Sequence, residues 1–243
     1  MSLPRFHVPE AAPGARLRLP DHAAHHAREV LRLRAGSTVR IFDGAGNEFD
    51  ATLDTVARAG VEARLAGPVS SRPESPLRIV LALSPLKGDR MEIVIQKATE
   101  LGVAEVWPVV TARTDAAARP ALKGSRVERW ERVASGAAEQ CGRAVVPFVA
   151  PTLTFGALLD RPWRGLRLLF LERGETSRLT SLPRPADSVL ALVGPAGGWE
   201  PAEADRLRAA GFLAASLGPR VLRAETAAMA AVTAMQVLWG DVG

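Results

Sequence analysis

The sequence lacks several features that define particular classes of protein. Of its 243 residues only Cys141 is a cysteine, so an internal disulfide cannot form, and a reducing, cytoplasmic location is expected. No apolar run is long enough to cross a bilayer, so no membrane-spanning helix is expected. Residues 1–10 lack the apolar core of a signal peptide. Lysine is scarce, and the lysines are Lys87, Lys97 and Lys123.

The charged residues are mostly arginines and carboxylates, and they leave a small positive surplus. There are 31 basic and 26 acidic residues, which gives a formal net charge of +5. Such a surplus favours an anionic partner such as nucleic acid. A nucleotide composition that favours arginine and alanine would give the same surplus, so charge alone does not choose between the two explanations.

The first seventy or so residues have the pattern of short strands joined by turns. Apolar residues alternate over residues 38–43 and again over residues 61–65, and a glycine-rich turn cluster occupies residues 44–47. This pattern predicts a meander that closes into a small barrel. A helix is expected before it over residues 22–33, with Asp21 as its cap.

The pattern changes after residue 76. Residues 67–76 are rich in proline and serine and are predicted to be a linker. Residues 77–83 form a continuous apolar run, as in a strand buried on both faces, and a helix capped by Asp89 should end at Gly102. Further strands are expected over 103–110, 166–171 and 189–193, with helices over 127–142 and 224–239. This alternation predicts an α/β domain with a mostly parallel sheet.

One glycine-rich loop, over residues 192–200, is a candidate ligand site. A buried strand ends there and a helix begins near Pro201, and α/β folds bind ligands at such strand ends. Glycines let backbone amides approach a ligand closely, but a tight strand-to-helix turn would look the same. The loop matches neither the dinucleotide fingerprint nor a Walker A motif, which excludes a nicotinamide enzyme of that type.

A second segment, over residues 216–227, combines a Gly-Pro turn with Arg220, Arg223 and Glu225. Two arginines beside a candidate ligand loop suit phosphate contacts or stabilisation of an anionic base. Glu225 is in the first turn of the expected helix, so simple helix capping remains an alternative role for it.

Four polar segments precede these loops. Residues 87–92 lead into a helix and residues 96–102 form its later part, and a solvated polar face is the plainer interpretation of both. Residues 111–114 come after the next strand, and residues 139–143 close the following helix.

Taken together, five motifs in this order resemble the RsmE family of 16S ribosomal RNA uracil-N3 methyltransferases, of the SPOUT superfamily. The motifs are K-x-x-R-M-E at 87–92, I-Q-K-A-T-E-L-G-V at 95–103, A-x-E-Q-C-G-R at 137–143, L-V-G-P-x-G-G at 192–198 and L-G-x-R-V-L-R-x-E-T-A at 217–227. Residues 4–7 and 42–44 also fit, so the resemblance covers most of the chain.

The resemblance implies a fold and an activity. Residues 1–72 would be a PUA-like β-barrel that assists RNA binding, and residues 73–243 an α/β SPOUT methyltransferase domain with a deep trefoil knot over roughly 188–243. The cofactor would be S-adenosyl-L-methionine, and the protein a cytoplasmic homodimer without a membrane partner. The substrate would be N3 of a uridine in 16S ribosomal RNA of the small subunit, near the decoding site.

The resemblance also implies site residues. The cofactor would contact Leu171, Leu192, Val193, Gly194, Pro195, Gly197, Gly198, Leu217, Gly218, Val221, Leu222 and Thr226. RNA-contact candidates are Arg5, Lys87, Arg90, Arg113, Arg143 and Arg220. We hypothesise that Arg223 stabilises the uracil anion or a phosphate and that Glu225 is the general base. No metal ligands are assigned.

One position departs from the family. An acidic residue usually stands in the middle of the G-P-x-G-G loop, and this chain has Ala196. The change favours one alternative, a non-catalytic ribosomal RNA-binding or assembly factor. A second alternative, independent of this change, is a SPOUT methyltransferase for a different RNA nucleotide. The motifs at 87–92 and 139–143 argue against the second alternative.

Overall fold

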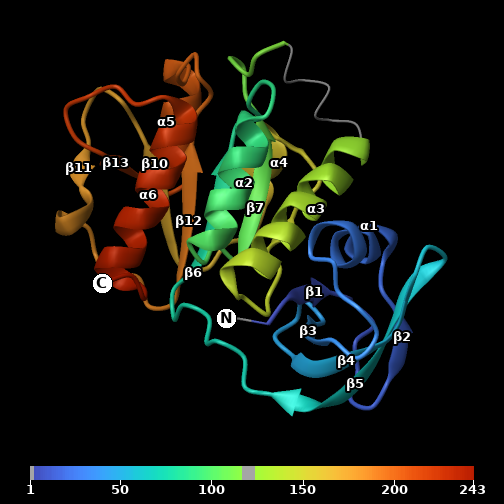
Figure 1. The fold of residues 1–243 in the computed structure, drawn as a ribbon. Coiled ribbons are helices and arrows are strands. Elements are labelled where there is room, and N and C mark those ends of the chain that lie inside the picture. The colour runs from blue at the N-terminus through green and yellow to red at the C-terminus, as the bar shows by residue number, and fades with distance from the viewer. Residues whose placement is uncertain (1–2, 117–123) are drawn as a thin grey trace. The chain divides into compact units, whose positions relative to one another are not determined.

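The computed structural model describes residues 3–116 and 124–243, which divide into two compact units (Figure 1). The β unit consists of residues 3–74 and Ser135–Val146, and the α/β unit consists of the described parts of Ser75–Ala134 and Pro147–Gly243. The boundary expected after residue 72 lies two residues before the observed one. Nothing in the sequence pattern indicated that Ser135–Val146 belongs with the first unit.

The β unit is a mixed five-stranded sheet with a main apolar core and a second small cluster of Phe42, Ala138 and Ala144. Its elements are β1 (Arg5–His7), β2 (Arg16–Arg18), α1 (Asp21–His25), η1 (His26–Val30), β3 (Thr38–Phe42), β4 (Glu48–Ala57) and β5 (Gly60–Val69). The strand order is β1-β3-β4-β5-β2, and only β1 and β3 pair in parallel. Alternate residues such as Val39, Ile41 and Leu53 enter the core. The edge strands β1 and β2 do not pair with each other in the described residues, so the ladder stays open.

The helix of the β unit is shorter than the sequence pattern predicted over 22–33. It begins at Asp21 with Pro20 as its N-cap, so Asp21 is not the cap, and its last turn is the π-helical η1 that ends at Val30. Arg32 then has a φ of 52°, a left-handed conformation that a right-handed helix cannot continue through. The linker predicted over 67–76 is also shorter, because β5 extends to Val69.

The α/β unit is built on an all-parallel sheet, as the alternating pattern predicted. Its elements are β6 (Arg78–Leu83), α2 (Arg90–Glu100), β7 (Glu105–Val110), α3 (Gly124–Cys141, whose end lies in the β unit), β8 (Phe148–Val149), β9 (Leu153–Thr154), α4 (Phe155–Asp160), β10 (Leu166–Phe170), β11 (Ser177–Arg178), η3 (Leu179–Ser181), β12 (Ser188–Val193), α5 (Pro201–Ala209), β13 (Leu213–Ser216) and α6 (Ala224–Trp239). The strand order is β11-β13-β10-β12-β6-β7-β8, and β9 also pairs with β7. The short β8, β9 and β11 were not predicted, because two residues show no period.

Helices cover both faces of this sheet. Apolar residues on one face, including Val80 of β6 and Leu190 of β12, pack in a cluster with Leu158 of α4 and Leu207 of α5. On the other face α2 and α6 lie side by side, and α6 also contacts β6 and β12 (Figure 1). Both faces of the strands are therefore buried, which explains the continuous apolar runs.

The parallel arrangement places the carboxyl ends of β10, β12 and β13 at one edge, where loops can form a shared site. The trefoil knot expected over 188–243 stays a prediction. No helix in the described residues is long and apolar enough to span a membrane.

Candidate functional site

A cavity of about 990 Å³ lies in the α/β unit, at the carboxyl ends of β10, β12 and β13. Three loops form its walls, one after each strand: residues 171–174, residues 194–199 and residues 217–223. The starts of α5 and α6 complete it. The two segments singled out in the sequence, 192–200 and 216–227, therefore lie on one cavity although they are separated by α5 and β13.

The glycine-rich loop is closely packed at Gly194. A Cβ at this position would lie 2.6 Å from Nε1 and 2.8 Å from Cε2 of Trp199, so the indole ring occupies the space that a side chain would need. Gly198 has a φ of 70° and donates a backbone hydrogen bond to Pro195 O at 2.9 Å, which closes the turn. The loop is therefore a compact turn with the Trp199 ring packed against its first residue.

Glu203 of α5 ties this loop to its neighbour. Its carboxylate accepts hydrogen bonds from Ala112 N at 2.8 Å and from Glu200 N at 3.2 Å, as part of a capping box at the start of α5. Glu203 is 7% exposed, so both bonds are shielded from water. The loop after β7 is thus attached to the helix that follows the glycine-rich loop.

Arg113 lies over the glycine-rich loop from that neighbouring side. Its Nη1 donates to Gly197 O at 3.3 Å, and its Nε is 3.9 Å from a Glu200 carboxylate oxygen. A Cβ on Gly197 would be 3.4 Å from Arg113 Cβ, an ordinary contact. Arg113 therefore both contacts the glycine-rich loop and lines the cavity.

The third loop leads into α6, whose N-cap is Arg223. The side chain of the N-cap residue makes no hydrogen bond to this helix end, but Glu225 lies in the first turn, where the helix dipole favours a carboxylate, so the capping role stays an alternative. Glu225 also lies 3.7 Å from Nε of Arg90, which comes from α2, and both residues line the cavity. The structure thereby brings the loop at 87–92 to the same site as the segment at 217–227.

Most of the predicted cofactor residues line this cavity. They are Leu171, Val193, Gly194, Pro195, Gly197, Gly198, Leu217, Gly218, Val221 and Leu222. Leu192 is not in the lining, because it is fully buried in the sheet, and Thr226 is an exposed residue of α6 that does not line it either. Sequence reasoning missed the residues after β10, Glu172 to Gly174, and those of α5, because neither segment carries a glycine-rich or paired-arginine signal.

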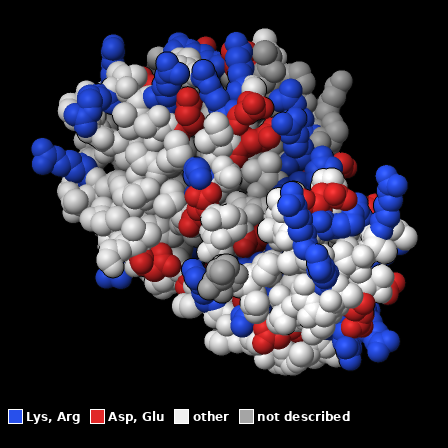
Figure 2. Space-filling model, viewed as in Figure 1, with Lys and Arg blue, Asp and Glu red and all other residues white. Residues whose placement is uncertain are grey.

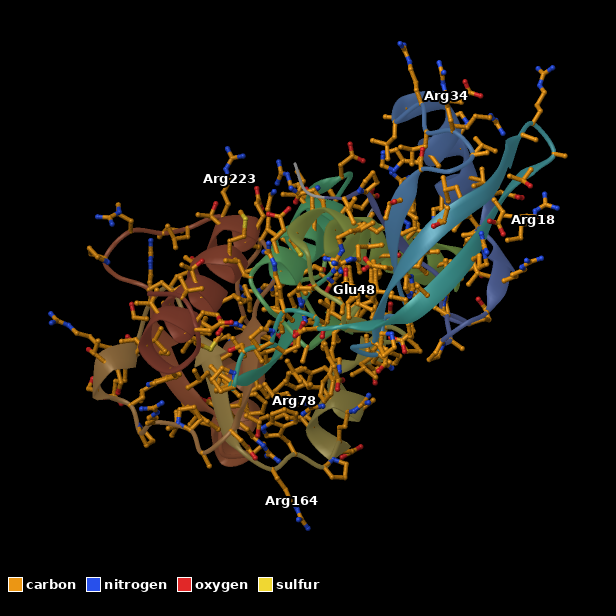
Figure 3. The ribbon with its side chains drawn as sticks, turned by 60° about the horizontal axis from the view of Figure 1, so that its bottom comes forward. Arg18, Arg34, Glu48, Arg78, Arg164 and Arg223 are labelled. Atoms are coloured by element: carbon orange, nitrogen blue, oxygen red, sulfur yellow. The ribbon has the colours of Figure 1, made fainter. Side chains whose placement is uncertain are left out.

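Positive charge dominates the cavity lining. Six arginines line it against three carboxylates: Arg90, Arg113, Arg173, Arg208, Arg220 and Arg223, with Glu172, Asp205 and Glu225. Figure 2 shows basic side chains gathered at the top of this unit, and Figure 3 shows Arg223 extending away from the ribbon. Within the described residues Arg220 and Arg223 are exposed and form no ion pair, so they are available to an anionic ligand.

The remaining RNA-contact candidates lie elsewhere. Lys87 is 2.7 Å from Asp115 and does not line the cavity. Arg143, in the β unit, is 9% exposed, and its Nε donates to both oxygens of Glu74 at 3.0 and 3.1 Å. Arg5 donates to Arg143 O at 3.0 Å and pairs with Glu48 at 3.3 Å, and burial lowers the pKa of its guanidinium. Arg5 and Arg143 thus hold the β unit together internally.

The residues 135–146 are joined to β1 by further polar contacts. His7 N donates to Glu139 Oε1 at 2.8 Å, and His7 Nδ1 is 2.8 Å from Ser135 Oγ. Burial lowers the pKa of the His7 imidazole and raises the pKa of the Glu139 carboxyl. The motifs at 4–7 and 137–143 therefore meet in one partly buried network.

Two family models match the chain. The model of the RNA methyltransferase domain matches residues 73–236, and that of the RNA methyltransferase PUA domain matches residues 19–64. The chain is 36% identical over 239 residues to a ribosomal RNA small subunit methyltransferase E from Synechocystis sp., covering 95% of this chain and 76% of that protein. It is 32% identical over 230 residues to the protein of the same name from Bacillus subtilis, covering 89% and 90%.

Solved structures resemble the fold over its full length. The ribosomal RNA small subunit methyltransferase E from Neisseria gonorrhoeae, bound to S-adenosyl methionine, has a TM-score of 0.90 and 36% identity, with 99% of this chain and 100% of that chain covered. A Legionella pneumophila protein solved in complex with the bound cofactor SAM has a TM-score of 0.93 and 34% identity, and both chains are covered completely.

Proposed function

Because the chain belongs to the ribosomal RNA small subunit methyltransferase E family, we propose that it transfers a methyl group from S-adenosyl-L-methionine to N3 of one uridine in 16S ribosomal RNA, near the decoding site. The observation that carries the proposal is the cavity at the carboxyl ends of β10, β12 and β13, which has a glycine-rich loop on one wall and free arginines on its rim. That arrangement suits a cofactor inside and an RNA strand outside.

The residues present fit S-adenosyl-L-methionine. Leu171, Val193 and Leu222 provide an apolar lining for an adenine ring. The amides of Val221 and Leu222 donate to no other backbone group in the described residues, so they are free to meet polar atoms of a ligand. Trp199 Nε1 is buried without a hydrogen-bond partner in the described residues, which leaves a further donor on the cavity wall.

The bound cofactor would supply a methyl group on a sulfonium, which is a good leaving group, so the protein's main task is to position the acceptor. Uracil N3 carries a proton, and its lone pair is drawn into the imide. Transfer therefore needs loss of that proton and stabilisation of the resulting anion. N3 also lies on the Watson–Crick edge, so the base must be unpaired or flipped out before it reacts.

Two side chains at the cavity suit these tasks. Glu225 is the carboxylate proposed to accept the N3 proton, and Arg90 holds it at the cavity wall through their contact at 3.7 Å. Arg223, exposed at the start of α6, is proposed to stabilise the uracil anion or a neighbouring phosphate. Arg220 and Arg113 line the same rim and are proposed phosphate contacts.

We also propose that the protein works as a homodimer in the cytoplasm and acts on the small ribosomal subunit. Val237 and Leu238 of α6 are 56% and 37% exposed, and adjacent exposed apolar side chains on a helix favour contact with a second chain. The β unit would assist binding of the RNA.

The test is calorimetric titration with S-adenosyl-L-methionine, followed by methyl transfer to small subunits that lack the modification. A methyl group on N3 blocks pairing, so primer extension should stop at one uridine of 16S ribosomal RNA. Glu225→Gln should lower the single-turnover rate about 100-fold or more, as for loss of a general base, while cofactor affinity stays within about threefold. A full rate in this variant would show that Glu225 is not the general base. Binding of RNA without binding of the cofactor would indicate a non-catalytic factor, and a stop at another position would indicate a different nucleotide.

A further inference from the structure

A second cavity, of about 700 Å³, lies at the opposite edge of the same sheet. It is formed where β6, β7 and β12 begin and by the loop that leads into β10, so it belongs entirely to the α/β unit. The residues that give it its chemistry are Arg78, Glu105, Trp107, Arg161, Trp163 and Arg164. A strand of six residues spans about 20 Å, which separates this cavity from the one at the carboxyl ends.

Aromatic rings and guanidinium groups alternate in this cavity. The rings of Trp107 and Trp163 meet edge to face, with centroids 6.0 Å apart and an interplanar angle of 89°. Arg161 Cζ lies 4.1 Å from the centroid of Trp107, and Arg78 Cζ lies 5.4 Å from that of Trp163. A guanidinium on an aromatic face keeps its N–H edges free for a further partner.

One of the two carboxylates of the cavity is paired with an arginine, and the other accepts a hydrogen bond from a serine. Glu105 forms an ion pair with Arg78 and accepts a hydrogen bond from Trp107 Nε1 at 2.7 Å. Asp187 accepts from Ser188 Oγ at 2.7 Å. Within the described residues Arg161 and Arg164 form no ion pair, and the three arginines of the lining outnumber its two carboxylates.

The loop that carries these arginines is fixed in place. Ser188 Oγ lies 3.1 Å from the carbonyl oxygen of Arg164, within hydrogen-bond distance, and Trp163 Nε1 donates to Leu166 O at 3.3 Å. Gly165 has a φ of 115°, and a Cβ there would collide with Ser188, so only glycine lets the loop lie this close to β12. Figure 3 shows Arg78 and Arg164 on the same side of the unit, with Arg164 projecting away from the ribbon.

We propose that this cavity is a second RNA site, which binds one nucleotide of a single-stranded segment of the substrate. The phosphate is held by the guanidiniums of Arg161 and Arg164, and the base packs against Trp163 and the plane of Arg78. Guanidiniums bind phosphate oxygens in pairs, and aromatic and guanidinium planes stack on unpaired bases. The proposal rests on RNA being the substrate, as argued above. It implies that the enzyme holds its RNA at a point about 20 Å from the methylated base.

The test compares a double variant, Arg161→Ala with Arg164→Ala, with the control Arg184→Ala. Arg184 is an exposed arginine of the same unit that lines neither cavity, so the control removes a charge but no site. Affinity for small ribosomal subunits is measured over a range of salt, and affinity for S-adenosyl-L-methionine is measured by calorimetry. The double variant should bind the subunits about tenfold more weakly or worse, with a log–log salt slope reduced by about two. The control should match wild type, and all proteins should bind the cofactor equally.

A second measurement locates the RNA directly. Photocrosslinking of 4-thiouridine-substituted 16S ribosomal RNA to wild type should label Trp163, and Trp163→Phe should retain more affinity than Trp163→Ala because a phenyl ring still stacks. Unchanged subunit affinity and salt slope in the double variant, with cofactor affinity intact, would overturn the proposal. If the double variant binds the subunits more weakly but wild type transfers no methyl group, the RNA site is supported and the proposed function is refuted.

Discussion

Replacement of Gly194 by alanine tests whether the first residue of the glycine-rich loop must lack a side chain. The backbone itself permits alanine, because Gly194 does not have a positive φ. The obstacle is the indole of Trp199, whose Nε1 would lie 2.6 Å from the new Cβ. Ordinary contact begins at 3.4 Å, so the ring must move by about 0.8 Å, the difference between these two distances.

The size of the effect follows from that displacement. Trp199 is packed against the apolar cluster beneath α5, so it cannot move freely. Overpacking of this kind costs about 1–3 kcal/mol. If the cost falls on the loop in its binding conformation, affinity for S-adenosyl-L-methionine drops by about 5- to 150-fold.

Gly197→Ala is the matched control. It is the same substitution in the same loop, also without a positive φ, but its nearest contact is Arg113 Cβ at 3.4 Å. Calorimetric titration should show less than a threefold change in cofactor affinity for this variant. Equal loss in both variants would mean that loop flexibility matters and the contact of Trp199 does not. Wild-type affinity in Gly194→Ala would refute the packing argument.

Three further predictions concern charge. Ala196→Asp adds a carboxylate to a cavity rich in arginines and should tighten binding of the cationic cofactor by about two- to fivefold, measured by calorimetry; weaker binding would contradict this. Arg143→Ala leaves Glu74 without its main partner and should lower the free energy of unfolding by about 2–3 kcal/mol in urea, whereas Arg16→Ala, 77% exposed, should change it by less than about 0.5 kcal/mol. The pKa of His7 is lower in the folded protein than in the unfolded chain, so the unfolded chain binds more protons as the pH falls through about 6.5. Between about pH 7.5 and about pH 5.5 the free energy of unfolding should therefore fall more for wild type than for His7→Gln. Parallel plots of the free energy of unfolding against pH would refute this.

Elements with a clear apolar pattern were predicted more accurately than the first helix. The runs at 77–83 and 189–193 predicted β6 and β12 to within a residue, because a strand buried on both faces must be apolar throughout. The last helix was predicted with its observed ends, 224–239. The helix at 22–33 was less accurate, because the left-handed turn at Arg32 has no signature in apolar spacing.

For the cavity, the sequence pattern identified two loops, and in the third loop the structure added residues 172–174 to Leu171, which only the family resemblance had implied. Residues 192–200 and 216–227 stand out by glycine and arginine content, so both were recognised. Residues 172–174 join the lining only because β10 lies between β12 and β13 in the sheet, whereas the start of α5 directly follows the glycine-rich loop. Strand order depends on tertiary packing, and no local pattern encodes it.

The sequence by itself determined the alternation of strands and helices, the motifs of a ribosomal RNA methyltransferase and the loops where a cofactor would bind, because these depend on residue types at fixed spacing. Only the tertiary structure decided which charges are free. Arg143 looked like an RNA contact, yet it is buried against Glu74, 69 positions away, while Arg220 and Arg223 remain exposed. The cavity with Trp107 and Arg161 likewise draws on distant segments. Burial and pairing of a charge are set by residues far along the chain, and these come together only when it folds.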